Sequence, residues 1–395
     1  AAGMTGLLLT CKHHEGFCLW PSKYTEFSVK NSPWKDGKGD IVKEVSEACR
    51  EEGLKFGVYL SPWDVHEETY GTPAYNDYFC NQMTELCSNY GELFCVWFDG
   101  ACRTADKVQG YDWDRYYSLI RKLQPNACIS ICGPDVRWIG NEAGESREEE
   151  WSVVPKSIMV TERNPGYWRQ LDTMPNSTWK DIGSRDFIKD YDELIWYPAE
   201  VDVSIRPSWG YVEGEEKQLY SLERLLYMYE KAVGGNATLL LNVPPNKEGL
   251  FDLEDVERLA ELGKAIRGLF SRPQTTVAKA FQKNGSNAEA ILDADRTHFV
   301  ELAGECQEIE IQLQGEHTID FIVLKETIEK GQRVEKFAVD IWREDQWKEI
   351  YQATTIGYQR FGRIEPVQTE RVRVRILESR GTVYLTEIGL YHTEK

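Results

Sequence analysis

Strand-like and helix-like patterns alternate along the first two-thirds of the chain, and this alternation constrains the fold more than any other feature. Short apolar runs typical of buried strands are followed by helical periodicity long enough for one crossover. The predicted strands are 7–11, 55–60, 93–98, 127–132 and 237–243, and the predicted helices are 41–52, 75–90, 111–123, 216–232 and 252–270. A parallel sheet covered by helices is therefore expected.

The length of the chain predicts a second domain. Its 395 residues exceed the roughly 250 of a β/α barrel. From residue 276 onward, short alternating segments separated by turns replace the helices. We therefore predict an α/β protein, with a TIM-like (β/α)8 barrel over residues 1–272 and an antiparallel β-sandwich over residues 273–395. Roughly six barrel strands are visible against eight in a complete barrel, so we expect the first strand to be missing upstream.

Composition limits the class of partner. The formal net charge of −19 argues against nucleic acid or an anionic membrane, which both attract basic surfaces, and suits a neutral substrate. A solvated acidic surface explains the same charge. No apolar run is long enough to span a bilayer, and a bacterial periplasm, secretion and the cytoplasm all stay open. The ten cysteines include no CxxC pair, so neither a zinc site nor a redox pair is indicated.

The buried run 93–98 ends in Asp99 and Gly100, and this carboxylate is the first catalytic candidate. The C-terminal ends of barrel strands form the open mouth where catalytic groups lie. The alternative is that Asp99 caps the next helix. His13 and His14 follow the first predicted strand, where two neutral imidazoles suit hydrogen bonding to vicinal hydroxyls. Adjacent residues at a strand end point in different directions, so we do not expect both to face one metal.

A second carboxyl candidate, Glu142, follows the fourth visible strand. It lies among aromatic and small residues, where partial desolvation would keep a proton available. One ionised and one protonated carboxyl are what glycosidic bond cleavage requires. The signal is weak alone, because four more acidic residues follow and read as a solvated run: Glu145, Glu148, Glu149 and Glu150. Glu200, near the end of another strand-like segment that presents Trp209, is the alternative acid.

Five strings carry these residues, in the order KHHEGFCLW, VWFDG, WIGNEAG, EVDVSIRPSWGY and LLLNVPPNKEG. In this order and spacing they resemble the family 29 α-L-fucosidases, over about residues 1–270. The resemblance implies an irregular (β/α)8 barrel, a C-terminal β-sandwich and a retaining mechanism through a covalent fucosyl-enzyme. By position, Asp99 matches the nucleophile. Glu142 matches the general acid/base of the subfamily selective for α-1,3/1,4-linked fucose in branched, Lewis-type glycans.

The resemblance also implies the remaining site residues. His13, His14 and Tyr59 match positions that contact fucose, and Trp209 matches a ring packing near the sugar. The predicted substrate-binding set is completed by Trp138, Glu200 and Arg137. In the family, the first strand and the segment after it contribute another His and a Glu-Trp pair to the fucose pocket. Neither precedes Ala1 in this sequence, so we expect an incomplete fucose pocket.

The C-terminal residues resemble the discoidin-like sandwich attached to this subfamily, some members of which bind sugars or calcium. Asp293 and Asp295 offer oxygen ligands for structural calcium, and a plain turn is the alternative. No cofactor or catalytic metal is expected.

The sequence therefore predicts an exo-acting, retaining α-L-fucosidase that acts on a fucosylated oligosaccharide or glycoprotein glycan, without nucleic acid or membrane insertion. The alternatives are a fucoside-binding protein without turnover and a broad-specificity α-L-fucosidase.

Overall fold

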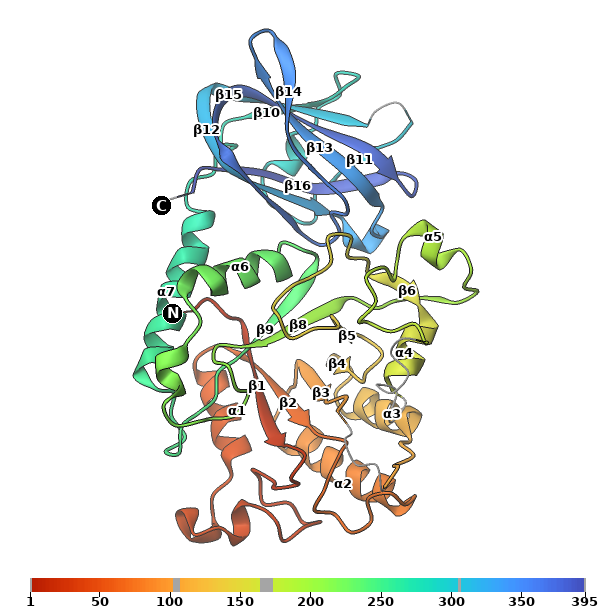
Figure 1. Ribbon diagram of the computed structural model, residues 1–395, viewed down its shortest axis with the longest axis vertical. Coiled ribbons are helices and arrows are strands. Elements are labelled where there is room, and N and C mark those ends of the chain that lie inside the picture. The colour runs from red at the N-terminus through yellow and green to blue at the C-terminus, as the bar shows by residue number, and fades with distance from the viewer. Residues whose placement is uncertain (1, 102–106, 164–172, 305–306, 394–395) are drawn as a thin grey trace.

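Two short parallel sheets form the centre of the first domain in the computed structural model, which describes residues 2–101, 107–163, 173–304 and 307–393 (Figure 1). The first sheet has the order β1-β2-β3-β4 and the second the order β5-β8-β9. The strands of the first are β1 (Gly6–Lys12), β2 (Lys55–Leu60), β3 (Cys95–Phe98) and β4 (Cys128–Ile131). Those of the second are β5 (Arg137–Trp138), β8 (Ala199–Ser204) and β9 (Ala237–Asn242).

Helices alternate with these strands as the sequence predicted. They are α1 (Ile41–Glu51), α2 (Ala74–Asn89), α3 (Trp113–Leu123), α6 (Leu222–Ala232) and α7 (Leu253–Leu269). The predicted helix 216–232 begins later than expected, because the Ser221 side chain accepts a hydrogen bond from the Arg224 amide and so caps α6 at its N-terminus.

The α/β class is confirmed, but the strand pairing of the described residues does not close one eight-stranded barrel. Between the two sheets, an isolated bridge joins Ser130 to Val136. The loop-rich stretch between β5 and β8 contains structure that the sequence did not predict: the antiparallel pair β6 (Val153–Pro155) and β7 (Leu194–Trp196), α4 (Lys156–Glu162) and α5 (Arg185–Ile188). These elements are too short to show the hydrophobic periodicity from which a helix or strand is predicted.

Seven antiparallel strands build the second domain, at the top of Figure 1. They are β10 (Lys279–Gln282), β11 (Val300–Leu302), β12 (Glu308–Glu326), β13 (Val334–Arg343), β14 (Gln346–Ala353), β15 (Arg360–Ser379) and β16 (Val383–Tyr391). The predicted strands 309–313 and 318–324 are one strand, β12, whose pairing with β15 shifts register between Gln312 and His317. Side chains from both halves of β12, such as Ile311 and Leu324, share one buried core, so the sheet wraps around it as a sandwich does.

The two domains are joined by polar and aromatic contacts. Gln332 of the second domain accepts a hydrogen bond from the Ser152 amide at 2.9 Å and donates one to the Glu150 carbonyl at 2.8 Å. The Arg380 guanidinium lies 3.4 Å from the centroid of the Trp151 ring. The second domain therefore holds the segment of the first that leads into β6.

The described cysteines form no disulfide with one another. Each of the eight described cysteines is free, and Cys102 and Cys306 lie outside these residues. Burial raises the pKa of buried thiols such as Cys11 and Cys132. Among the helices that the structure describes, none combines the length and apolar character needed to cross a membrane.

Candidate active site

Asp99 lies directly after β3, where the backbone leaves the first sheet. Its Oδ2 accepts a hydrogen bond from the Tyr59 hydroxyl at 2.8 Å, and its Oδ1 accepts one from the Ala101 amide at 2.6 Å. Burial and the charge of Asp99 raise the pKa of Tyr59 far above its usual value, so the phenol stays a donor. The next described helix, α3, is capped by Asp112. Asp99 therefore does not serve as the cap of α3.

His14 is fixed between β2 and Asp99. Its Nδ1 lies 2.6 Å from Ser61 Oγ, and the Ser61 hydroxyl donates to the Trp63 carbonyl at 2.6 Å. Because the serine proton is used there, Nδ1 of a neutral His14 carries the proton and donates to Ser61. Nε2 then lies 3.8 Å from Asp99 Oδ2. This orientation directs an acceptor nitrogen toward the candidate nucleophile.

His13 lies on the same side as His14, which corrects the expectation that the two rings diverge. Their ring centroids are 3.9 Å apart, and the His13 ring stacks on Tyr59 at 5.9 Å. The register of β1 against β2 shifts between Thr10 and Lys12, which breaks the strict alternation just before the histidines.

Ligand atoms of His13, His14 and Asp99 lie within 4.8 Å of one another, so these three are the residues with which this site could hold a metal ion. Two imidazoles and one carboxylate are a donor set that suits Zn²⁺. Asp99 already accepts two hydrogen bonds from the protein, and the chemistry considered below does not require a metal.

Glu142 is exposed on the loop between β5 and β6. Its Oε2 accepts a hydrogen bond from Trp209 Nε1 at 3.2 Å. Trp209 is 40% exposed, and its carbonyl accepts from the Asn242 side chain at the end of β9 at 2.8 Å. The half-buried Trp138 of β5 pairs in register with Glu200 of β8. Glu142 and Trp209 therefore form a second cluster, tied to the second sheet.

The carboxyl of Asp202 is influenced by charges from both clusters. This residue of β8 is buried, and sequence reasoning missed it. Its pKa is raised well above the usual value by burial and, in decreasing order, by the charges of Glu200, Asp99 and Glu142. Asp99 and Glu142 thus lie within electrostatic reach of the same buried carboxyl. The sequence signal that could have identified Asp202 is its i, i+2 spacing from Glu200, which places the two side chains on the same face of a strand.

Glu200 does not reach the surface as a substrate ligand or an alternative acid would. It is 8% exposed, and its Oε1 accepts a hydrogen bond from Trp97 Nε1 of β3 at 2.7 Å. Strand β8 buries every one of its side chains. The sequence prediction of a sugar contact at Glu200 is corrected, because its carboxyl is committed to the protein interior.

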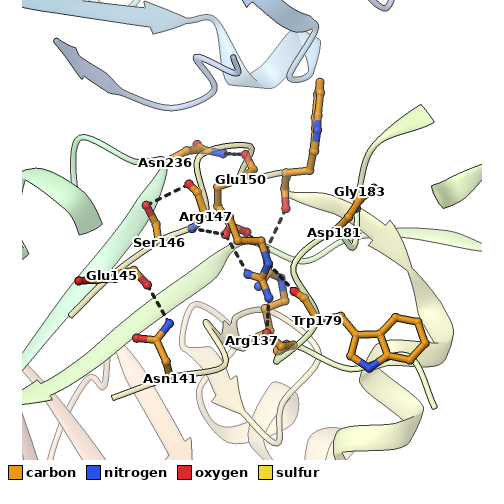
Figure 2. A network of polar contacts seen from close by, with 12 residues as sticks. Arg137, Asn141, Glu145, Ser146, Arg147, Glu150, Trp179, Asp181, Gly183 and Asn236 are labelled. Carbon is orange, nitrogen blue, oxygen red and sulfur yellow. Dashed lines mark hydrogen bonds and ion pairs between the residues drawn. The ribbon is translucent and has the colours of Figure 1, made fainter. Parts of the chain in front are cut away.

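Arg137 is also placed in the interior, contrary to its prediction as a substrate ligand (Figure 2). Its guanidinium pairs with Glu150 and donates to the carbonyls of Trp151 and Tyr197, each at 3.0 Å. Glu150 is 1% exposed, so it does not belong to a solvated run. Burial opposes its ionisation, but Arg137 and Arg147 outweigh burial and lower the pKa of Glu150.

Arg147 connects this ion pair to the Glu142 loop (Figure 2). It binds Glu150 at 2.9 Å, the Trp179 carbonyl at 2.9 Å and the Ser177 carbonyl. Within the loop, the Asn141 side chain donates to the Glu145 carbonyl at 2.9 Å. Gly140 has φ +104°, and a Cβ there would lie 1.9 Å from the Ser177 carbonyl oxygen. A glycine is therefore required where the loop leaves β5.

The turn around Asp293 and Asp295 uses the oxygens on which the calcium prediction relied. Asp293 Oδ1 accepts from the Asp295 amide, and Asp295 Oδ1 accepts from the amide and hydroxyl of Thr297. Such bonds are typical of Asx turns. Calcium at this site stays a prediction.

Comparisons with known proteins place this geometry in context. The family model Alpha-L-fucosidase matches residues 1–267. Alpha-L-fucosidase 1 of Arabidopsis thaliana is 35% identical over 407 residues, covering 99% of this chain and 76% of that protein. A solved structure from Bacteroides ovatus has a TM-score of 0.88 and 42% identity, and covers 100% of this chain. This chain spans only 65% of that one.

A Ruminococcus gnavus GH29 fucosidase in complex with fucose is similar as well. It has a TM-score of 0.85 and 28% identity, and the match covers 100% of this chain and 83% of that one.

Proposed function

Because the chain belongs to the α-L-fucosidases of glycoside hydrolase family 29, we propose that it releases α-1,3/1,4-linked L-fucose from branched, Lewis-type glycans with retention of configuration. The proposal rests on two carboxyl groups, Asp99 at the end of β3 and Glu142 on the loop after β5, and the charges of both contribute to the raised pKa of the buried Asp202. Each is held by an aromatic donor, Tyr59 or Trp209. Two carboxyls on one site are the chemical requirement of glycoside hydrolysis.

In the first step, the Asp99 carboxylate attacks the anomeric carbon and forms a fucosyl ester. The bond from that carbon to the leaving oxygen breaks, and Glu142 gives its proton to this oxygen. In the second step, Glu142 takes a proton from water, which attacks the same carbon and displaces Asp99. Two inversions give net retention, the mechanism known for the family. A retaining pair works at a separation of about 5 Å, and inversion requires about 6.5–9.5 Å.

The side chains around Asp99 suit a neutral sugar. His13 and His14 present imidazoles beside the carboxylate, where they can exchange hydrogen bonds with sugar hydroxyls. Trp209 exposes a ring beside Glu142 that suits the apolar face of a sugar. The solved R. gnavus relative is described in complex with fucose, which supports the same ligand here.

Specificity for branched glycans rests on the WIGNEAG string, which resembles the α-1,3/1,4-selective subfamily. We also propose that the two parallel sheets are arcs of the irregular (β/α)8 barrel of the family.

Paired glutamine variants test the assignment of the acid. Glu142→Gln should lose release from a Lewis trisaccharide by about 10²–10⁴-fold, because a sugar leaving group requires protonation. It should retain far more activity on an aryl fucoside with an activated leaving group, and azide should restore turnover. Glu200→Gln, the matched control, should show no azide rescue.

Full activity of Glu142→Gln on the trisaccharide would contradict the assignment. Binding of the trisaccharide by the unmodified protein without release of fucose would favour the fucoside-binding alternative. Equal release from unbranched fucosides would favour a broad-specificity enzyme.

A further inference from the structure

Strand β8 has two chemically different faces, although all its side chains are buried. Ala199, Val201 and Val203 pack into apolar clusters. The alternate residues Glu200, Asp202 and Ser204 therefore share the other face. Glu200 reaches Trp97 of β3 there, so this polar face looks toward the first sheet.

Two carboxyls on this face lie in an environment that opposes two negative charges. Glu200 is 8% exposed and Asp202 is 5% exposed, and each of the two carboxyls is among the groups that shift the pKa of the other. Oxygen Oδ1 of Asp202 is buried without a hydrogen-bond partner among the described residues. The largest charge effects on Asp202 come from Glu200, Asp99 and Glu142, and all three are carboxyls. A hydrogen bond between two carboxyls requires one proton.

The neighbouring groups on the first sheet do not supply a compensating cation. Cys95 and Cys128 feel the charge of Glu200, and burial raises the pKa of both thiols, so they stay neutral. Trp97 contributes an indole N–H donor. The pair must therefore satisfy its charge by retaining a proton rather than by forming an ion pair.

This pair is connected to the proposed nucleophile through aromatic rings. Trp97, which donates to Glu200, stacks on Tyr59 with ring centroids 5.0 Å apart and an angle of 18° between the ring planes. The Tyr59 hydroxyl donates to Asp99 at 2.8 Å. The position of the Tyr59 ring thus depends on where Glu200 holds Trp97.

We propose that Asp202 is a positioning residue that stays protonated and donates a hydrogen bond to Glu200, so that Glu200 holds Trp97 against Tyr59, the donor to Asp99. The inference rests on the proposed function, because Asp99 matters here as the nucleophile. Asp202 itself touches neither the sugar nor the reacting atoms. Its proton prevents a second negative charge from accumulating beside Asp99 and Glu142.

The proposal has a defined pH signature in stability. A carboxyl with a raised pKa in the folded protein holds its proton more tightly than in the unfolded chain. As the pH rises above the ordinary carboxyl range of about 4, the unfolded chain gains stability by ionising and the folded protein does not. The wild type should therefore lose stability relative to Asp202→Asn, which cannot ionise. The loss continues until the pH passes the pKa of the folded pair.

The experiment measures Tm between about pH 4 and pH 8 for the wild type, Asp202→Asn and the exposed control Asp114→Asn. The Tm of Asp202→Asn minus that of the wild type should increase with pH. The Tm of Asp114→Asn minus that of the wild type should not change with pH. An infrared spectrum at neutral pH should contain a protonated carboxylic acid band that Asp202→Asn lacks. That amide variant should keep kcat on an aryl fucoside within about threefold, because it retains a donor to Glu200.

Asp202→Ala removes the donor and should lower kcat about tenfold or more, with a smaller change in KM. A Tm difference that does not change with pH, together with no loss of protonated carboxyl absorption in Asp202→Asn, would overturn the proposal. So would equal kcat values for the alanine and asparagine variants. Failure of the wild type to release fucose, with the Tm signature present, would reject the proposed function but not the shared proton.

Discussion

The two candidate carboxyls are held in different ways. Asp99 follows a strand and accepts a hydrogen bond from Tyr59 on the neighbouring strand, so its position follows from the pairing of β2 with β3. Glu142 lies on an irregular loop. That loop is fixed by the buried Arg137–Glu150–Arg147 network, and the Glu150 carbonyl is bound in turn by Gln332 of the second domain. The position of the proposed nucleophile thus depends on local strand geometry, and that of the proposed acid depends on long-range ionic contacts.

The contacts around Asp99 and those around Glu142 differ in how far apart the contacting residues lie along the chain, not in whether these residues are buried. The nucleophile side also contains a buried ion pair, Lys12 with Asp64 at 2.8 Å, in which both side chains are at most 1% exposed. That pair joins the ends of adjacent strands. The acid side needs contacts between residues about 180 positions apart, so its loop geometry depends on the docking of the second domain.

The largest effect should follow removal of the proposed nucleophile, Asp99. Asp99→Asn should lower kcat at least about a thousandfold on both an aryl fucoside and a Lewis trisaccharide, because the fucosyl ester cannot form. Initial rates on the two substrates measure this loss. Asp114→Asn on α3 is the exposed control. A variant that lost activity on the trisaccharide alone would place Asp99 in the acid role.

Removal of the phenol should have a smaller effect that is also independent of the leaving group. Tyr59→Phe deletes a hydrogen bond to a charged carboxylate, for which about 1.5–3 kcal/mol is typical, so kcat should fall about 10–100-fold. Parallel assays on the two substrates check this prediction. A loss confined to the substrate with the poorer leaving group would contradict the link from Tyr59 to the nucleophile.

The acid side should respond differently. Arg147→Met leaves Glu150 paired with Arg137 but removes the bonds to the Trp179 and Ser177 carbonyls. We expect kcat on the trisaccharide to fall about tenfold through a loosened Glu142 loop, with little change on an activated aryl fucoside that needs no proton. Equal loss on both substrates would remove the distinction between the two sides. Lys156→Met, whose ion pair with Glu193 is exposed, is the control.

The smallest effect concerns stability on the acid side. Burial raises the pKa of Glu162 to about 7, although Ser177, Arg137 and Arg147 oppose the shift. Because the folded-state pKa is raised, the wild type should lose about 1–3 kcal/mol relative to Glu162→Gln between about pH 4.5 and 7, and nothing further above that range. Denaturation midpoints at several pH values measure the loss. A difference independent of pH would show that Glu162 is ionised normally.

Sequence patterns predicted the parts of this molecule that depend on local order. The alternating strands and helices, and the placement of Asp99 near His14, follow from the rule that parallel strand ends meet at one edge, whereas Tyr59 was predicted only through the family resemblance. Glu142 gave only a weak signal until its string was matched, because an exposed loop glutamate has no periodicity to distinguish it. The broken register near Lys12 could not be foreseen, and so His13 was expected to diverge from His14.

Buried charges were the main source of error. Arg137 and Glu150 look like surface residues in the sequence, and only the three-dimensional packing brings them together across 13 positions. Glu200, Asp202 and Ser204 alternate with apolar residues in β8, and this pattern does not say which face of the strand lies toward the mouth. Tertiary contacts decide whether a charged side chain is solvated or paired.

Covalent trapping tests the central claim most directly. The protein is incubated with a 2-deoxy-2-fluoro-fucosyl fluoride, which slows hydrolysis of the glycosyl-enzyme, and the labelled peptide is sequenced by mass spectrometry. We predict one fucosyl label, on the side chain of Asp99. A label on any other carboxylate, or rapid turnover to 2-deoxy-2-fluorofucose of inverted configuration without a label, would contradict the assignment of the two carboxyls.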